Sequence, residues 1–127
     1  MVWLADALKD DFGISTVPEA AERGLAIRTT AGELIPIVED ARGRAFRKDK
    51  RLRDMEVELL VRRYERQPFV QIIRVYELSD EEHFEVDYWC DVCAIVMFEP
   101  GPCSCCQDDN RIRKRLVEDF DPQALQK

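Results

Sequence analysis

All five cysteines of this 127-residue chain lie in one short stretch, between residues 90 and 106. Four of them form two pairs, each with a two-residue spacer, and nine residues separate the pairs: Cys90, Cys93, Cys103 and Cys106. Cysteine pairs with this spacing are typical ligands of a tetrahedral structural zinc site. Two thiolate sulfurs on one zinc ion lie about 3.8 Å apart, and a two-residue spacer lets the chain turn tightly enough to reach that separation. The spacing therefore predicts one metal ion held by four thiolates.

Cys105 is predicted to be a spectator thiol beside these four. Pairing it with Cys103 leaves a one-residue spacer, and the neighbouring Cys105 and Cys106 cannot easily ligate one ion together. Exchange of ligands with Cys105 is the alternative.

The identity of the metal stays open between zinc and iron. Iron in a rubredoxin-like site is the alternative to zinc, because four thiolates suit both metals. Unligated or disulfide-bonded cysteines are the third interpretation. A site made of four cysteines has no spare coordination position, which favours a structural role over a hydrolytic one.

The cysteine segment resembles the short zinc-ribbon family, in which two C-x2-C knuckles are separated by about ten residues with a turn before the second. The resemblance makes the first cysteine pair one knuckle and the second pair the other. The chain departs from the family after each knuckle, where glycine is usual because the backbone often takes a positive φ; this sequence has Ala94 and Gln107 there. The knuckles and their flanking aromatic residues also look like a segment of uncharacterised bacterial proteins with a similar preceding β-domain.

Strands are predicted on both sides of the cysteine pairs. Residues alternate between apolar and polar before Cys90, with Phe84, Val86 and Tyr88 on the inward face. The predicted strands are His83–Trp89, Ala94–Phe98 and Arg111–Val117, with a turn at Glu99–Pro102. The first of these strands runs directly into the metal site.

Four further strands are predicted upstream: Leu25–Thr30, Glu33–Glu39, Met55–Glu65 and Phe69–Leu78. Pro36 places the second at a sheet edge or a bulge, because proline cannot donate to the ladder. The fourth is apolar on both faces and is predicted to lie in the middle of the sheet. Together with His83–Trp89 these make five predicted short strands, and they do not alternate with helices. This pattern resembles a small OB-fold barrel over about residues 24–89. An SH3-like barrel or an open β-meander fits the same pattern.

Two short helices are predicted near the N-terminus. Residues 2–12 carry an apolar stripe at helical spacing, and Gly13 is a plausible stop. Thr16 and Glu19 fit a capping box for a second helix that Gly24 closes. Both helices are expected to cover an end or edge of the following sheet.

The segment Asp40–Asp54 is basic and is predicted to be a loop with a helical turn, anchored by Phe46 and Leu52. Its basic side chains are candidates for contact with nucleic-acid phosphates: Arg42, Arg44, Arg47, Lys48, Lys50, Arg51 and Arg53. The formal net charge of −7 argues against a protein built chiefly to hold nucleic acid.

These elements predict a mainly β fold, with α+β character at the N-terminus: a small OB-like antiparallel barrel followed by a zinc ribbon. The predicted division is a helical extension at 1–23, the barrel at 24–82, the ribbon at 83–118 and a tail at 119–127.

No catalytic set is visible in the sequence. His83 is the only histidine and is expected in an exposed turn, and no glycine-rich phosphate-binding motif occurs. We therefore expect no enzyme but a non-catalytic, zinc-stabilised binding module that mediates protein or nucleic-acid interaction, with a protein favoured as the partner over single-stranded nucleic acid. A redox or metal-handling protein with a rubredoxin-like site is the alternative.

The sequence predicts no membrane segment, because no apolar run approaches the ~20 residues that a span requires. Charged residues break the first twelve positions, unlike a signal peptide. The odd number of closely spaced cysteines favours metal in a reducing compartment, so a cytoplasmic location is expected. An exported form trimmed of its signal fits equally well.

Overall fold

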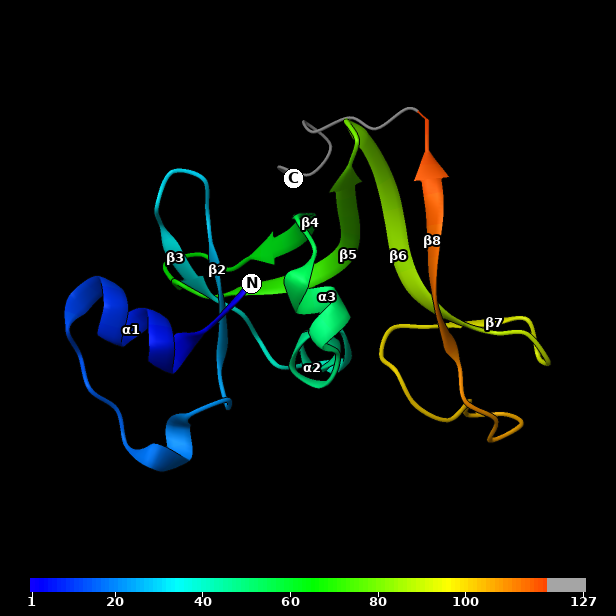
Figure 1. Ribbon diagram of the computed structural model, residues 1–127, viewed down its shortest axis with the longest axis horizontal. Coiled ribbons are helices and arrows are strands. Elements are labelled where there is room, and N and C mark those ends of the chain that lie inside the picture. The colour runs from blue at the N-terminus through cyan, green and yellow to red at the C-terminus, as the bar shows by residue number, and fades with distance from the viewer. Residues whose placement is uncertain (119–127) are drawn as a thin grey trace.

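The computed structural model describes residues 1–118, so the tail predicted at 119–127 lies outside the described residues. The described chain forms two antiparallel sheets and three short α-helices (Figure 1). The first sheet has the strand order β1 (Val2–Trp3), β2 (Leu25–Arg28), β3 (Leu34–Pro36). The second has the order β4 (Val57–Arg63), β5 (Val70–Ser79), β6 (Glu82–Cys90), β7 (Ile95–Met97), and β8 (Arg111–Val117) pairs with β6. The predicted mainly β class is confirmed.

The two sheets are not closed into one barrel. The predicted barrel strands are divided, with β2 and β3 in one sheet and β4, β5 and β6 in the other. A parallel bridge between Ile37 and Val70 connects the sheets, and the Val38 N–H donates to the Val70 carbonyl at 2.9 Å. Pro36 lies in β3, at the edge of its sheet as predicted. The OB-like arrangement stays a prediction.

Strand β5 lies between β4 and β6, as its apolar composition on both faces predicts. The register of β4 against β5 shifts between Leu60 and Val61, which pair with Arg74 and Ile72. Ile73 is therefore the extra residue of a bulge on β5. Bulges bend a strand and re-aim the neighbouring side chains, and this one comes directly before the point where β5 separates from β6.

The first predicted helix is confirmed as α1 (Leu4–Phe12), which ends at Gly13 with φ 67°. The second is only a 3-10 turn, η1 (Pro18–Ala20), and no side chain caps it. The capping box predicted at Thr16 is therefore wrong. Proline restricts the residue before it to extended conformations, and Val17 accordingly has ψ 153° and begins the turn one residue later than a Thr16 cap requires. No helix among residues 1–118 combines the length and apolar character needed to cross a membrane.

The basic segment forms two helices, α2 (Ala41–Lys48) and α3 (Lys50–Asp54), and the prediction of a loop is wrong. Each helix begins at an aspartate: Asp40 accepts from the Gly43 N–H and Asp49 from the Arg51 N–H, both at 3.0 Å. Side-chain caps of this kind typically stabilise a helix by about 1 kcal/mol. A Cβ on Gly43 would lie 2.3 Å from the Val38 carbonyl oxygen, so only glycine lets α2 approach the preceding chain.

The core lies between these helices and the second sheet. Phe46 and Leu52, the predicted anchors, are 0% and 2% exposed, and they pack with Ile72 and Val75 of β5. Of the residues predicted to face inward on β6, Val86 and Tyr88 are buried and Phe84 is half-buried. The core therefore holds β5 and β6 against α2 and α3.

Candidate metal centre

Strand β6 connects the core to the cysteines. Its first half pairs with β5, from Ser79↔Glu82 to Val75↔Val86. Its second half pairs with β7, from Tyr88↔Met97 to Cys90↔Ile95. Strand β8 covers the opposite edge of β6 (Figure 1). The strands predicted around the cysteine pairs are thus present, although β7 is shorter than expected, and the domain boundaries stay a prediction because β6 belongs to both parts.

The four predicted ligands lie together. The Sγ atoms of Cys90, Cys93, Cys103 and Cys106 are all within 4.8 Å of one another. The Sγ atoms of Cys90 and Cys106 are 3.5 Å apart, close to the ~3.8 Å expected for thiolates on one tetrahedral ion. Cys90 and Cys103 are buried, at 1% and 0% exposure, and the other two are half-buried. The donor set fits one metal ion that prefers sulfur ligands.

Both knuckles turn tightly at the residue that follows them. The Ala94 N–H donates to the Cys90 carbonyl at 2.8 Å, and the Gln107 N–H donates to the Cys103 carbonyl at 3.0 Å. Ala94 has φ 54° and Gln107 has φ 67°, the left-handed conformation that usually selects glycine. The departure from the zinc-ribbon pattern therefore leaves the backbone conformation of the knuckles intact.

Backbone N–H groups point at the sulfurs. Those of Cys93 and Cys105 lie 3.4 Å from the Sγ atoms of Cys90 and Cys103, respectively. The pKa of Cys103 is lowered to about 7, first by the backbone N–H of Cys106 and then by that of Cys105. A thiolate is the form that binds metal, so these donors prepare the buried sulfur as a ligand.

Cys105 is exposed and does not belong to the group of four. The pKa of Cys93 is raised, first by interaction with the Cys105 thiol and then by burial. The structure therefore places Cys105 beside the site, within reach of a ligand that has partial solvent access.

Two polar residues that the sequence did not single out fix the loop before the second knuckle. The Asn110 side chain accepts from the Gly101 N–H at 3.1 Å and donates to the Glu99 carbonyl at 2.9 Å. The Glu99 carboxylate accepts two hydrogen bonds from Arg44 of α2, at 2.6 and 2.5 Å. The hydrogen bond from Arg44 is the main reason that the pKa of Glu99 is lowered. Helix α2 thus holds the cysteine loop from outside.

The seven basic residues proposed for nucleic-acid contact all have partners within the chain. Arg44 and Lys48 pair with Glu99, Arg47 with Glu39, Lys50 with Asp54, and Arg51 with Asp49. Arg53 donates to two backbone carbonyls, and Arg42 lies over the Phe98 ring. Their charge is largely engaged inside the fold, and contact with nucleic acid stays a prediction.

His83 is not a metal ligand candidate in this fold. It lies in β6, and its Nε2 is 3.0 Å from Glu58 Oε1 on β4. Its side chain is 17% exposed, so the expected exposed turn position is wrong. The turn ends at Glu81, and β6 begins at Glu82.

No protein-family model matches the chain, and neither a curated protein nor a solved structure matches it. The case for a metal-binding, ribbon-like site therefore rests on the cysteine geometry itself.

Proposed function

We propose that this protein is a non-catalytic binding module whose C-terminal lobe is held in shape by one zinc ion. The observation that carries the proposal is the convergence of four cysteine sulfurs within 4.8 Å, contributed by two knuckles. Four protein ligands leave no coordination position for water or substrate, which supports a structural role for the metal.

The composition of the lobe also supports a structural metal. Cys103 is the only buried residue within residues 91–118, so side-chain burial alone gives this segment little stability. A structural zinc site contributes about 10–16 kcal/mol of apparent binding free energy to folding. A metal ion is therefore sufficient to order a lobe that lacks an apolar core of its own.

A protein partner is favoured by the surface of the lobe. Val92, Val96 and Phe98 are 69%, 40% and 41% exposed. Exposed apolar groups and aromatic rings of this kind are typical of protein interaction surfaces. The net charge of −7 and the paired basic residues of α2 and α3 favour a protein over nucleic acid.

Elemental analysis of protein purified without a metal-binding tag tests the proposal. We expect one zinc per chain in the wild type and in Cys105→Ser, which keeps the four ligands and serves as the matched control. Cys90→Ser should lose most of the metal and melt at a lower temperature. A metal-free wild type that folds as well as Cys90→Ser would refute the proposal.

Metal or redox handling is the second candidate, and the contact between Cys105 and Cys93 favours it. An exposed thiol beside a ligand supports ligand exchange during metal transfer or oxidation. Iron in the site would give a red protein with visible absorption bands. A colourless protein with one zinc ion would exclude an iron site. Equal rates of zinc transfer to a chelator in the wild type and in Cys105→Ser would exclude ligand exchange through Cys105.

A further inference from the structure

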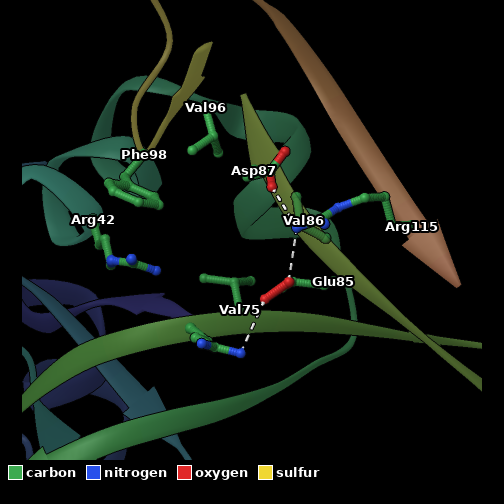
Figure 2. A pocket seen from close by; sticks show the side chains of 9 residues that line it. Arg42, Val75, Glu85, Val86, Asp87, Val96, Phe98 and Arg115 are labelled. Carbon is green, nitrogen blue, oxygen red and sulfur yellow. Dashed lines mark hydrogen bonds and ion pairs between the residues drawn. The ribbon is translucent and has the colours of Figure 1, made fainter. Parts of the chain in front are cut away.

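A cavity of about 310 Å³ lies where β6 changes its pairing partner. The pairing of β6 with β5 ends at Val75↔Val86, and its pairing with β7 begins at Tyr88. Strands β5 and β7 therefore diverge around Asp87 of β6. We call the space between β5 and β7 the fork pocket. Figure 2 shows Val75, Val86 and Asp87 around this space. None of the five cysteines lines the pocket.

The acidic groups of the fork pocket are engaged on its β8 side. Arg115 donates to both Glu85 and Asp87 at 2.9 Å. Arg113 forms two further hydrogen bonds with Asp87, both at 2.8 Å. These two carboxylates therefore already have cationic partners, and they line the pocket without needing a ligand.

Arg42 and Arg74, on the opposite side of the pocket, form no side-chain hydrogen bonds with these carboxylates. Arg74 approaches Glu85 only to 3.7 Å, which is beyond hydrogen-bonding distance. Within residues 1–118, no carboxylate lies within ion-pair distance of Arg42, whose guanidinium instead stands 3.7 Å from the centre of the Phe98 ring. Figure 2 shows this guanidinium directed into the space between Phe98 and Val75. Two cationic groups with free donors thus face the pocket.

The electrostatic setting of Arg42 favours an anion. Its pKa is lowered by burial first and by the charge of Arg74 second, although Asp40, Glu85 and Asp87 act in the opposite direction. Two like charges in a partly desolvated space repel each other more strongly than in water. A negative group placed between Arg42 and Arg74 would relieve this repulsion.

The remaining walls are apolar. Val75 and Val86 line the pocket from β5 and β6, and Val96 and Phe98 line it from the β7 side. Val96 and Phe98 are about two-fifths exposed, so a ligand that covers them would bury apolar surface. A volume of about 310 Å³ lies at the small end of the range for ligand pockets, about 300–1,000 Å³.

We propose that the fork pocket binds one carboxylate attached to a small apolar group, with Arg42 and Arg74 contacting the carboxylate and Phe98 covering the apolar group. A monoanion is favoured over a dianion because Glu85 and Asp87 line the same space and repel a second negative charge. Such a group is supplied either by a free small acid or by the C-terminal residue of a partner protein. The proposal goes beyond the binding module proposed above, because none of the four clustered cysteines lines the pocket.

Titration of the full chain with sodium benzoate tests the proposal, with amide shifts followed in ¹⁵N-HSQC spectra. We expect a Kd on the order of 1 mM and shifts concentrated at the pocket. Benzamide, which has the same shape without the charge, should bind at least about tenfold more weakly. Arg42→Gln should weaken benzoate binding by a similar factor.

Arg47→Gln is the matched control, because Arg47 is on the same helix and does not line the pocket. It should bind benzoate like the wild type. If Arg42→Gln does not fold, Arg74→Gln replaces it, since the Arg74 side chain is 57% exposed. Equal binding of benzoate and benzamide, or equal weakening in Arg47→Gln, would overturn the proposal. Tighter binding of inorganic phosphate than of benzoate would also overturn it.

The tripeptide Gly-Gly-Phe, with a free or an amidated C-terminus, distinguishes the two sources. If the free-acid peptide binds at least as tightly as benzoate and the amide does not bind, the proposal is supported with a partner C-terminus as the source. If benzoate binds and neither peptide does, the proposal is supported with a free small acid as the source.

Discussion

The core and the cysteine lobe of this protein are stabilised by different means. The core buries large side chains from five elements, including Phe46, Leu52 and Ile72 at 2% exposure or less. The cysteine lobe, residues 91–118, buries only Cys103 and exposes Val92 and Phe98. Hydrophobic burial can hold the first region. The second depends on strand pairing with β6, on the packing of Met97 and Ile112 against the core, and on its thiols. Loss of a bound metal is therefore expected to damage the lobe, and loss of an apolar contact to damage the core.

Removal of the metal is expected to have the largest effect, confined to the cysteine lobe. A strong chelator should abolish the dispersed amide signals of residues 91–118 in ¹⁵N-HSQC spectra, because the lobe loses about 10–16 kcal/mol of metal binding. Signals from β4 and β5 should remain dispersed, since Ile72 and Val75 stay packed. Cys105→Ser should respond to the chelator like the wild type. Simultaneous loss of both sets of signals would show that the two regions are not separately stabilised.

The opposite experiment is Phe46→Ala, which removes a fully buried ring from the core. We expect the free energy of unfolding from urea denaturation to fall by about 3–5 kcal/mol, as for other buried phenylalanines. Phe98→Ala, which truncates an exposed ring of the lobe, should cost less than about 1 kcal/mol. Similar losses in the two variants would contradict the assignment of the hydrophobic core to one region.

Tyr88 joins the two regions, because its backbone pairs with Met97 of β7 and its hydroxyl donates to the buried Asp49 at 2.8 Å. Burial raises the pKa of Asp49, but hydrogen bonds from Arg51 and Tyr88 outweigh it and lower the pKa. Tyr88→Phe leaves this buried carboxylate short of a donor and should cost about 1–3 kcal/mol in urea denaturation. Tyr64→Phe is the control, since Tyr64 is 39% exposed and its hydroxyl donates to Gln71, and the unfolding free energy of this variant should be nearly unchanged. Equal effects would show that the buried hydroxyl is dispensable.

The ion pair between Arg44 and Glu99 predicts a smaller, pH-dependent effect. The pKa of Glu99 is lowered from 4.5 in the folded protein. The ionised Glu99 carboxylate therefore contributes fully to stability above the ordinary glutamate pKa, and this contribution is lost as the pH falls below that value. Arg44→Gln should therefore lower Tm by a few degrees at pH 7, and the difference from wild type should shrink toward pH 3. Lys50→Gln, which breaks an exposed pair with Asp54, should change Tm less at pH 7. A difference for Arg44→Gln that is constant with pH would contradict the role of Glu99.

The features predicted correctly from the sequence are the local ones. Cysteine spacing alone identifies the four cysteines whose sulfurs lie together, and the sequence pattern identifies β6 and β8 beside them. Ala94 and Gln107 both adopt the left-handed conformation usual for glycine. Cysteine spacing therefore predicts the knuckle turns better than the residue type at these two positions does.

The features missed depend on contacts between distant residues or on polar capping. Helix α2 lacks an apolar stripe, and its cap at Asp40 and close packing at Gly43 leave no periodic pattern to detect. The open sheets and the fork pocket arise from the change of partner along β6, and nothing in the alternation of His83–Trp89 encodes that change. The link from Arg44 to Glu99 spans 55 residues and follows from the fold alone.

X-ray absorption spectroscopy of the purified full chain tests the central claim most directly. The account predicts a zinc edge and a first shell of four sulfur atoms at about 2.3 Å, with the same spectrum from Cys105→Ser. A shell that includes nitrogen or oxygen, fewer than four sulfurs, or a spectrum that changes in Cys105→Ser would contradict a site closed by Cys90, Cys93, Cys103 and Cys106.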